Sequence, residues 1–363
     1  MPQKQPKQIG HGSQTVCAST FSLRPVECNK GTKMISSIHK RAVLLFLTMT
    51  GLIVSMNPLY AAQEYELIQD LSIGVDVGDE NIMFGSIINI SLDGNQNIYV
   101  LDRKNYQIKK FDTHGKFLSK ITIEKGQGPK EASGPSSIAV TPSGMIYLLD
   151  FSAKKIIVFK ESGEFHNSIQ LAFQLTYCVP YGDEDVAVIG LKDDKLIHIY
   201  NAGGRQLDSF GGPYDVPSKL SQYKDMPLLK APMRFSGAEG SRLFLLNPHG
   251  YEITMYENGE VARVIQGKNK SFVPLMASSP DKKRFSIMFP TINVFEHKEL
   301  LYVWIKAMPG AGGNQLDIFR DYIPIASLEA RGEAWVVDSS GRIYFAEEDD
   351  YPKVVRYRII SKN

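Results

Sequence analysis

The sequence carries almost no net charge, and this absence narrows the range of partners. Its 363 residues include 41 Lys and Arg against 39 Asp and Glu, which leaves a formal charge of +2. Proteins that bind nucleic acid usually have a concentrated basic face, and a balanced charge gives no reason to expect one. Hydrophobic residues make up 43% of the chain, as in ordinary globular proteins. The composition therefore argues against a nucleic-acid partner and against extensive disorder.

The sequence also lacks an apolar run long enough to cross a membrane. Lys40 and Arg41 precede the run 42–54, which is shorter than the roughly 20 apolar residues of a spanning helix. A charged start, a short apolar stretch and a small-residue end at Ala61 and Ala62 are typical of a cleaved secretory signal. We therefore predict an exported protein, periplasmic or extracellular, with no membrane span after the signal is cleaved.

Residues 1–33 precede this signal and are polar, without any periodic pattern. Because a secretory signal normally lies at the start of the translated chain, we hypothesise that translation begins at Met34. The predicted organisation is a polar extension over residues 1–33, a signal peptide over 34–62 and one folded domain over 63–363.

Cysteine is scarce. Two of the three cysteines, Cys17 and Cys28, lie in the polar extension, which leaves Cys178 alone in the folded domain. A single thiol cannot form an internal disulfide. Cys178 falls within residues 175–179, Leu-Thr-Tyr-Cys-Val, which are typical of a buried strand, where a free cysteine usually acts as a small hydrophobic residue. We predict a packing role for Cys178 and no nucleophilic one.

Long amphipathic helices are missing from residue 63 onward, where short segments rich in Ile, Val, Tyr, Phe and Leu alternate with turn-forming clusters. Residues 87–121 and 136–169 repeat one scheme of four strands. In both, the second strand reads Ile-Tyr-x-Leu-Asp, and Asp102 and Asp150 occupy matching places. Four strands in a repeated unit of this length indicate a β-propeller blade.

Weaker copies of the unit bring the number of blades to six. The final unit stops without a fourth strand, whereas residues 65–72 form a strand that belongs to no blade. An N-terminal strand that completes the last blade would also cover an exposed sheet edge. We predict an all-β fold, a six-bladed β-propeller with four-stranded blades whose ring is closed by the N-terminal strand. The second strands of the weaker copies are residues 186–189, 243–246, 301–304 and 343–346.

The two clearest units resemble NHL repeats. The resemblance rests on the second-strand cores that end at Asp102 and Asp150, and on the turns at residues 111–115 and 159–163. The connector at residues 126–140 is similar to that of exported bacterial six-bladed propellers of the NHL/TolB-like group. The match is specific over residues 87–169 and loose from 175 onward. It implies a fold and an exported location but no function, because most of that group has no assigned activity.

The glycine-rich stretch at residues 126–135, Gly-Gln-Gly-Pro-Lys-Glu-Ala-Ser-Gly-Pro, raises the question of a phosphate-binding loop. Such a loop needs a helix N-terminus after it, because the N–H groups at the helix end hold the anion. Here residues 136–140 follow, Ser-Ser-Ile-Ala-Val, which favour another strand. We therefore predict that the stretch is the crossing from the outer strand of blade 1 to the inner strand of blade 2.

In a propeller these crossings share one face with the turns between second and third strands, and we call it the loop face. We predict that the loop face binds a protein, peptide or glycan. The alternative is a solvated rim whose charges interact weakly, with the two repeated aspartates bonded to nearby turn amides. The candidate binding residues are Asp102, Arg103, Lys130, Glu131, Asp150, Lys154, Tyr214 and His249.

Catalytic signatures are absent from the sequence. A second hypothesis is a calcium-dependent hydrolase, similar to six-bladed lactonases and esterases, whose site lies at the central channel. Calcium prefers oxygen ligands, and Asn293 and Glu333 are the best candidates on the inner strands. The histidines do not recur at one blade position, which argues against a shared zinc cage. The sequence favours a binding protein without a cofactor over an enzyme, and Ca²⁺ belongs only to the alternative.

Overall fold

The computed structural model describes residues 64–232, 234–237, 240–278, 286–288, 290, 292–307 and 313–362. The predicted extension and signal peptide, residues 1–33 and 34–62, lie outside the described residues. Both therefore stay predictions.

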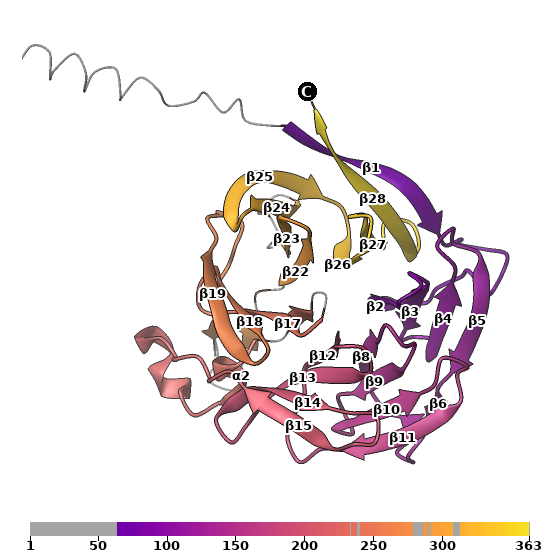
Figure 1. The fold of residues 1–363 in the computed structure, drawn as a ribbon, viewed down its shortest axis with the longest axis horizontal. Coiled ribbons are helices and arrows are strands. Elements are labelled where there is room, and N and C mark those ends of the chain that lie inside the picture. Colours follow the sequence, from indigo (N-terminus) through magenta and orange to yellow (C-terminus); the bar gives the residue numbers. More distant parts are fainter. Residues whose placement is uncertain are drawn as a thin grey trace, which may run out of the picture. The chain divides into compact units, whose positions relative to one another are not determined.

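Six antiparallel four-stranded sheets follow one another around a ring, which confirms the predicted all-β, six-bladed propeller (Figure 1). In the first five blades the strands run in chain order from the centre outward. Blade 1 holds β2 (Ile87–Leu92), β3 (Ile98–Asp102), β4 (Gln107–Phe111) and β5 (Phe117–Thr122). Blade 2 holds β8 (Pro135–Val140), β9 (Ile146–Asp150), β10 (Lys155–Phe159) and β11 (Phe165–Gln170). Blade 3 holds β12 (Tyr177–Tyr181), β13 (Asp185–Lys192), β14 (Lys195–Tyr200) and β15 (Gln206–Phe210).

The weaker sequence copies form blades of the same kind. Blade 4 holds β16 (Phe235–Gly237), β17 (Arg242–Leu246), β18 (Glu252–Glu257) and β19 (Glu260–Gln266). Blade 5 holds β22 (Ile292–His297), β23 (Leu300–Ile305), β24 (Asn314–Arg320) and β25 (Ile323–Ala330). Blade 6 holds β26 (Glu333–Val337), β27 (Ile343–Glu347) and β28 (Lys353–Lys362), with β1 (Glu64–Ile73) as its outer strand.

The N-terminal strand closes the ring, as predicted from the strand inventory. β1 pairs antiparallel with β28, in a register that sets Glu64 opposite Lys362 and Ile73 opposite Val354. Figure 1 shows the two strands side by side, the first in indigo and the last in yellow. The pairing gives blade 6 its fourth strand and covers the edge that β28 would otherwise expose.

Burial follows from the position of each strand within its blade. All five residues of β3 and all five of β9 are buried, because neighbouring blades cover both faces of the second strand. The outer strands behave differently: β19 has a single buried residue, Ile265. This gradient explains why the second strands are continuous apolar runs in the sequence and are the easiest strands to recognise.

Polar side chains tie the inner strands of neighbouring blades together. Asn89 and Ser91 of β2 accept hydrogen bonds from the backbone N–H groups of Ile138 and Val140 in β8, at 2.9 and 3.0 Å. Between blades 4 and 5, the N–H of Val294 donates to Ser236 Oγ at 2.9 Å. These bonds hold the inner ends of the sheets in fixed relative positions, so the centre of the ring is a rigid scaffold.

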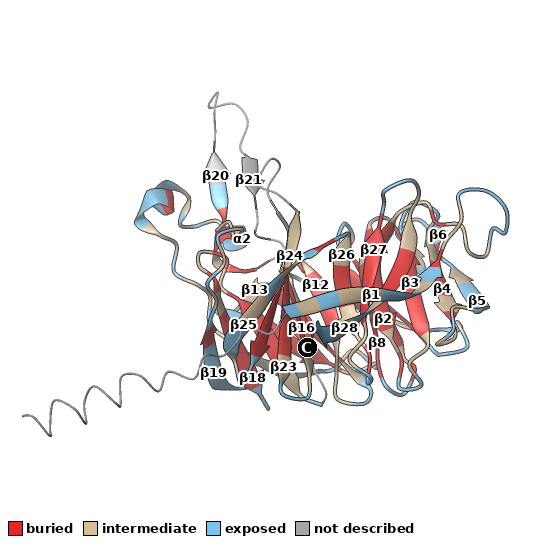
Figure 2. Ribbon diagram, turned by 90° about the horizontal axis from the view of Figure 1, so that it is seen from above, coloured by how far each residue is buried: buried red, intermediate tan, exposed pale blue. Residues whose placement is uncertain are grey.

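Two crossings are longer than the others and rise from the same face of the ring (Figure 2). The crossing between blades 3 and 4 contains η1 (Ser218–Tyr223) and α2 (Pro227–Lys230), and the next crossing contains β20 (Met276–Ser278) and β21 (Ser286–Met288). Leu220, Leu229 and Leu275 pack together into a small core of their own. Neither helix in the described ranges is long and apolar enough to span a membrane.

Candidate functional site

The repeated aspartates of the loop face are buried and serve the turns of their own blades. Asp102 accepts hydrogen bonds from the backbone N–H groups of Gly85 and Ser86, at 2.9 and 3.0 Å. Asp150 accepts in the same way from Ser133 and Gly134, at 2.7 and 2.9 Å. Both side chains are fully buried, so a ligand would have to displace these turns to reach them. The structure thus gives both residues the alternative role that the sequence offered, that of bonding turn amides.

The neighbouring basic residues are open to solvent. Arg103 and Lys154 are exposed in the turns between second and third strands. Lys154 adopts a φ of +52°, the left-handed conformation that such tight turns require. These two side chains remain free to meet a ligand on the loop face.

The glycine-rich crossing directs backbone carbonyl oxygens toward a cation. A phosphate-binding loop does the reverse, because it directs backbone N–H groups toward an anion. Lys155 Nζ donates to the carbonyls of Gln127 and Gly128, at 3.3 and 2.6 Å. Glu131 accepts from the N–H of Gly128 at 2.8 Å, while the exposed Lys130 pairs with Glu124 at 2.6 Å. The crossing runs from β5 to β8 through β6 (Glu124–Lys125) and β7 (Glu131–Ala132), so the prediction of a connector is confirmed.

Tyr214 and His249 anchor the first long crossing to blade 4. The Tyr214 hydroxyl donates to the carbonyl of Leu245 at 3.4 Å, and the His249 ring Nε2 bonds to the carbonyl of Leu229 in α2 at 2.8 Å. Burial lowers the pKa of His249, so the neutral ring with Nε2 as the donor is the favoured form. The structure thus gives both residues a part in holding α2 above the ring.

A charged and aromatic cluster lies at the centre of the loop face, and we call it the axial cluster: Tyr177, Arg234, Glu333 and Trp335. Tyr177 and Glu333 are the first residues of β12 and β26, and Arg234 directly precedes β16. All three therefore lie where crossings meet inner strands, which places them at the loop-face end of the ring's centre. The cluster draws on blades 3 and 4 and on blade 6, which is separated from them in sequence by blade 5.

The guanidinium of Arg234 organises this cluster. It forms an ion pair with the Glu333 carboxylate and lies 4.5 Å from the centre of the Trp335 ring and 5.7 Å from that of Tyr177. Both distances fall within the range of cation–π attraction. The side chains of Arg234 and Glu333 are 25% and 23% exposed, so solvent reaches the pair. A ligand can reach it as well.

Asn89 fixes the aromatic side of the axial cluster. Its side-chain amide donates to the Tyr177 hydroxyl at 2.7 Å, while its oxygen accepts from the backbone of β8. Burial raises the pKa of Tyr177, which keeps the phenol neutral. Tyr177 is therefore an uncharged aromatic wall, fixed by Asn89, beside the Arg234–Glu333 ion pair.

The two candidate calcium ligands do not form an oxygen cage. Asn293 donates its side-chain amide to the carbonyl of Ala334 at 2.6 Å, and the Glu333 carboxylate is taken by Arg234. A guanidinium beside the carboxylate repels a cation and supplies the charge that a metal would otherwise provide. Over the described ranges no group of three His, Cys, Asp or Glu side chains gathers closely enough to hold a metal ion.

Cys178 is buried in β12, as expected, and burial raises the pKa of its thiol to about 12. The reactive form of cysteine is the thiolate, which is therefore scarce at neutral pH. This matches the predicted packing role.

Comparisons with known proteins agree on the fold. The model of the DUF5128 family, described as a 6-bladed beta-propeller, matches residues 78–194, which cover blades 1 and 2 and the start of blade 3. No curated protein matches the sequence.

Solved structures resemble most of the chain. A candidate exported protein from Bacteroides fragilis covers 85% of this chain and 98% of its own, with a TM-score of 0.57 and 12% identity. A member of the duf4221 family from Bacteroides vulgatus covers 83% of this chain and 100% of its own, with a TM-score of 0.52 and 13% identity. At such identities the likeness shows the fold alone.

Proposed function

We propose that this chain is an exported β-propeller of the NHL/TolB-like group, whose loop face binds a protein, peptide or glycan and performs no reaction of its own. The observation that carries the proposal is the axial cluster. Arginine, tryptophan and tyrosine are the residues enriched at the energetic centres of binding interfaces, and here they meet around a solvent-reachable ion pair on a rigid ring.

The composition of the axial cluster favours a protein or peptide among these ligands. A carboxylate of the ligand competes with Glu333 for the fork of Arg234 donors, since arginine binds carboxylates through two parallel hydrogen bonds. The exposed Arg103 and Lys154 add positive charge at the rim of the same face. Acidic segments are therefore the expected partners, and the long crossing with η1 and α2 offers a side wall.

Site-specific photo-crosslinking tests the proposal in the cell that exports the protein. A photoreactive residue replaces Lys219, exposed in η1 on the loop face, or Ser162, exposed in a β10–β11 turn on the opposite face. We expect a discrete adduct from position 219 and none from 162. Arg234→Ala should weaken that adduct, whereas Arg205→Ala, an exposed arginine in the β14–β15 turn, should leave it unchanged. Equal adducts from both faces, or insensitivity to Arg234→Ala, would refute the assignment.

A further inference from the structure

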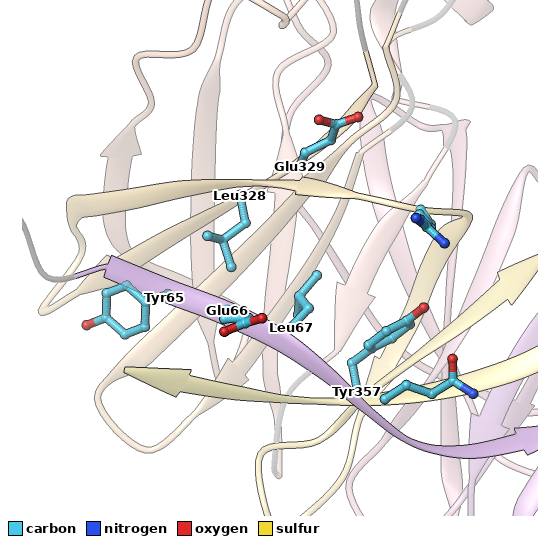
Figure 3. Close-up of a pocket in the computed structure, with 8 residues that line it drawn as sticks. Tyr65, Glu66, Leu67, Leu328, Glu329 and Tyr357 are labelled. Carbon is cyan, nitrogen blue, oxygen red and sulfur yellow. The ribbon is translucent and has the colours of Figure 1, made fainter. Parts of the chain in front are cut away.

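A cavity of about 450 Å³ opens at the junction where the ring closes, away from the axial cluster. It lies between β25 of blade 5 and β1 of blade 6, with Tyr357 of β28 at one side (Figure 3). We call it the closure pocket. Its volume falls within the range of small-ligand sites, which is about 300–1,000 Å³.

The closure pocket has a small apolar centre. Figure 3 shows Leu67 of β1 and Leu328 of β25 extending toward one another across the gap, with the Tyr357 ring beside them. Tyr357 is held by its hydroxyl, which donates to Glu347 at 2.7 Å, and by an edge-on contact with Phe345 at 5.3 Å between ring centres. The Tyr357 ring is therefore already ordered, so its side chain loses little conformational entropy when a ligand stacks on it.

Most of the lining is polar, and part of it is unengaged. Six of the eight lining residues carry polar side-chain atoms, the two leucines being the exceptions. Arg331 and Gln69 form no side-chain hydrogen bond or ion pair with any residue that the structure describes, unlike Arg234, Arg242, Arg342 and Arg356, which all pair with carboxylates. Hydrogen-bonding groups that line one cavity without bonding to one another are available to a ligand.

These features fit a carbohydrate. A sugar ring offers an apolar C–H face, which packs on an aromatic ring, and hydroxyl pairs at its edge, which need donors and acceptors together. Arg331 supplies up to five donors, Gln69 supplies both kinds, and Glu66 is an acceptor. A lipid would leave this polar lining unsatisfied, and the presence of both charge signs does not favour a strongly charged ligand.

We propose that the closure pocket binds one or two sugar units, with a ring stacked on Tyr357 and hydroxyls bonded to Arg331 and Gln69. The site is separate from the axial cluster and does not depend on the function proposed for it. Because Tyr65 and Tyr357 come from opposite ends of the folded chain, the pocket exists only when the ring is closed. A bound sugar therefore stabilises the closed ring.

Saturation-transfer NMR on the purified chain tests the proposal. The probes are the methyl glycosides of glucose, galactose, mannose, N-acetylglucosamine and glucuronic acid, together with cellobiose and lactose. We expect at least one probe to bind, with affinity lowered about tenfold or more by Arg331→Ala, since a charge-assisted hydrogen bond is worth about that factor. Tyr357→Phe loses the hydrogen bond to Glu347 but keeps the ring and its edge-on contact with Phe345, so it should still bind, whereas Tyr357→Leu should lose binding. Circular dichroism checks that each variant is folded.

The matched control is Arg263→Ala, which removes an arginine of the outer strand β19 that lies 4.7 Å from the ring of Tyr322, in the β24–β25 turn of blade 5. It should leave sugar binding unchanged. The proposal fails if no probe binds, or if Arg331→Ala binds the probes as well as the parent does. If Arg234→Ala abolishes sugar binding and Arg331→Ala does not, the sugar belongs to the axial cluster. In that case the closure pocket loses its assignment while the loop-face proposal stands.

Discussion

Removal of the Arg356 guanidinium tests whether ring closure depends on a buried charge as well as on backbone pairing. Arg356 of β28 donates Nε to Asp70 of β1 at 2.7 Å and Nη1 to the carbonyl of Thr113 in blade 1 at 2.8 Å. It also donates to the Tyr344 hydroxyl at 3.2 Å. One side chain thus joins the first strand, the last strand and the neighbouring blade.

The expected cost follows from the burial of this pair. The side chains of Arg356 and Asp70 are 8% and 18% exposed. Breaking a buried ion pair by removing one partner typically costs about 3–5 kcal/mol, because the remaining charge keeps its desolvation penalty. Water reaches Asp70 in part, and Arg358 lies 3.4 Å from its other oxygen. We therefore expect Arg356→Ala to lower the free energy of unfolding by about 3 kcal/mol, the lower end of that range.

Urea unfolding followed by tryptophan fluorescence measures this change, since Trp304 and Trp335 are both buried. The control is Lys362→Ala in the same strand pair, where Lys362 and Glu66 form a 3.3 Å ion pair with both side chains about half exposed. Such a surface pair is worth about 0–1 kcal/mol. If Arg356→Ala costs no more than Lys362→Ala, backbone pairing alone closes the ring and the reasoning is refuted.

Three further predictions use other parts of the ring. Burial lowers the pKa of His198, whose Nε2 lies 3.0 Å from the Gly190 carbonyl, so the unfolded state binds more protons than the folded state. The free energy of unfolding should therefore fall as the pH drops below about 6.5. Urea titrations between pH 5 and 7 should show that this free energy depends less steeply on pH in His198→Gln, and an unchanged dependence would contradict the lowered pKa of His198. Lys155→Met removes the cation from the glycine-rich crossing, so hydrogen–deuterium exchange should rise at residues 126–132, and unchanged protection would show that the ammonium does not hold the loop. Added calcium, and then a chelator, should each leave the melting midpoint within about 1 °C of its value without additive, because Arg234 already pairs with the Glu333 carboxylate. A bound calcium ion would raise the midpoint by several degrees. A rise with calcium that Glu333→Ala abolishes would support the hydrolase hypothesis instead.

The fold could be predicted from the sequence because the blades pack in the same way and use similar residues at matching positions. The buried second strands are uninterrupted apolar runs, and Asp102 and Asp150 recur because both blades need a carboxylate for the same turn amides. Ring closure could be predicted by counting strands. The last unit has only three strands and the N-terminal strand belongs to no unit, so the N-terminal strand was the available fourth strand. The long crossings broke the spacing, but their helices were too short to leave a periodic signal.

The axial cluster and the closure pocket could not be predicted because neither lies within one repeat. Tyr177, Arg234 and Glu333 come from three blades whose sequences have drifted from the repeat, and only the closed ring brings them together. A residue that recurs in every unit usually serves the unit itself, as Asp102 does. Polar or aromatic residues at the starts of inner strands, where the units differ, were the available signal for the axial cluster, and no local pattern joins Arg331 to Tyr357.

The pairing of β1 with β28 sets the order in which the ring can fold. Residues at opposite ends of the folded chain, such as Glu64 and Lys362, are direct neighbours in one sheet, and contacts of such long sequence separation form slowly because the intervening loop must close first. A chain that emerges N-terminus first exposes β1 as an unpaired strand until its last residues appear, and unpaired strands invite aggregation. Among the described strands, β1 therefore waits longest for its partner, and during that interval its unpaired edge is open to pairing with other chains.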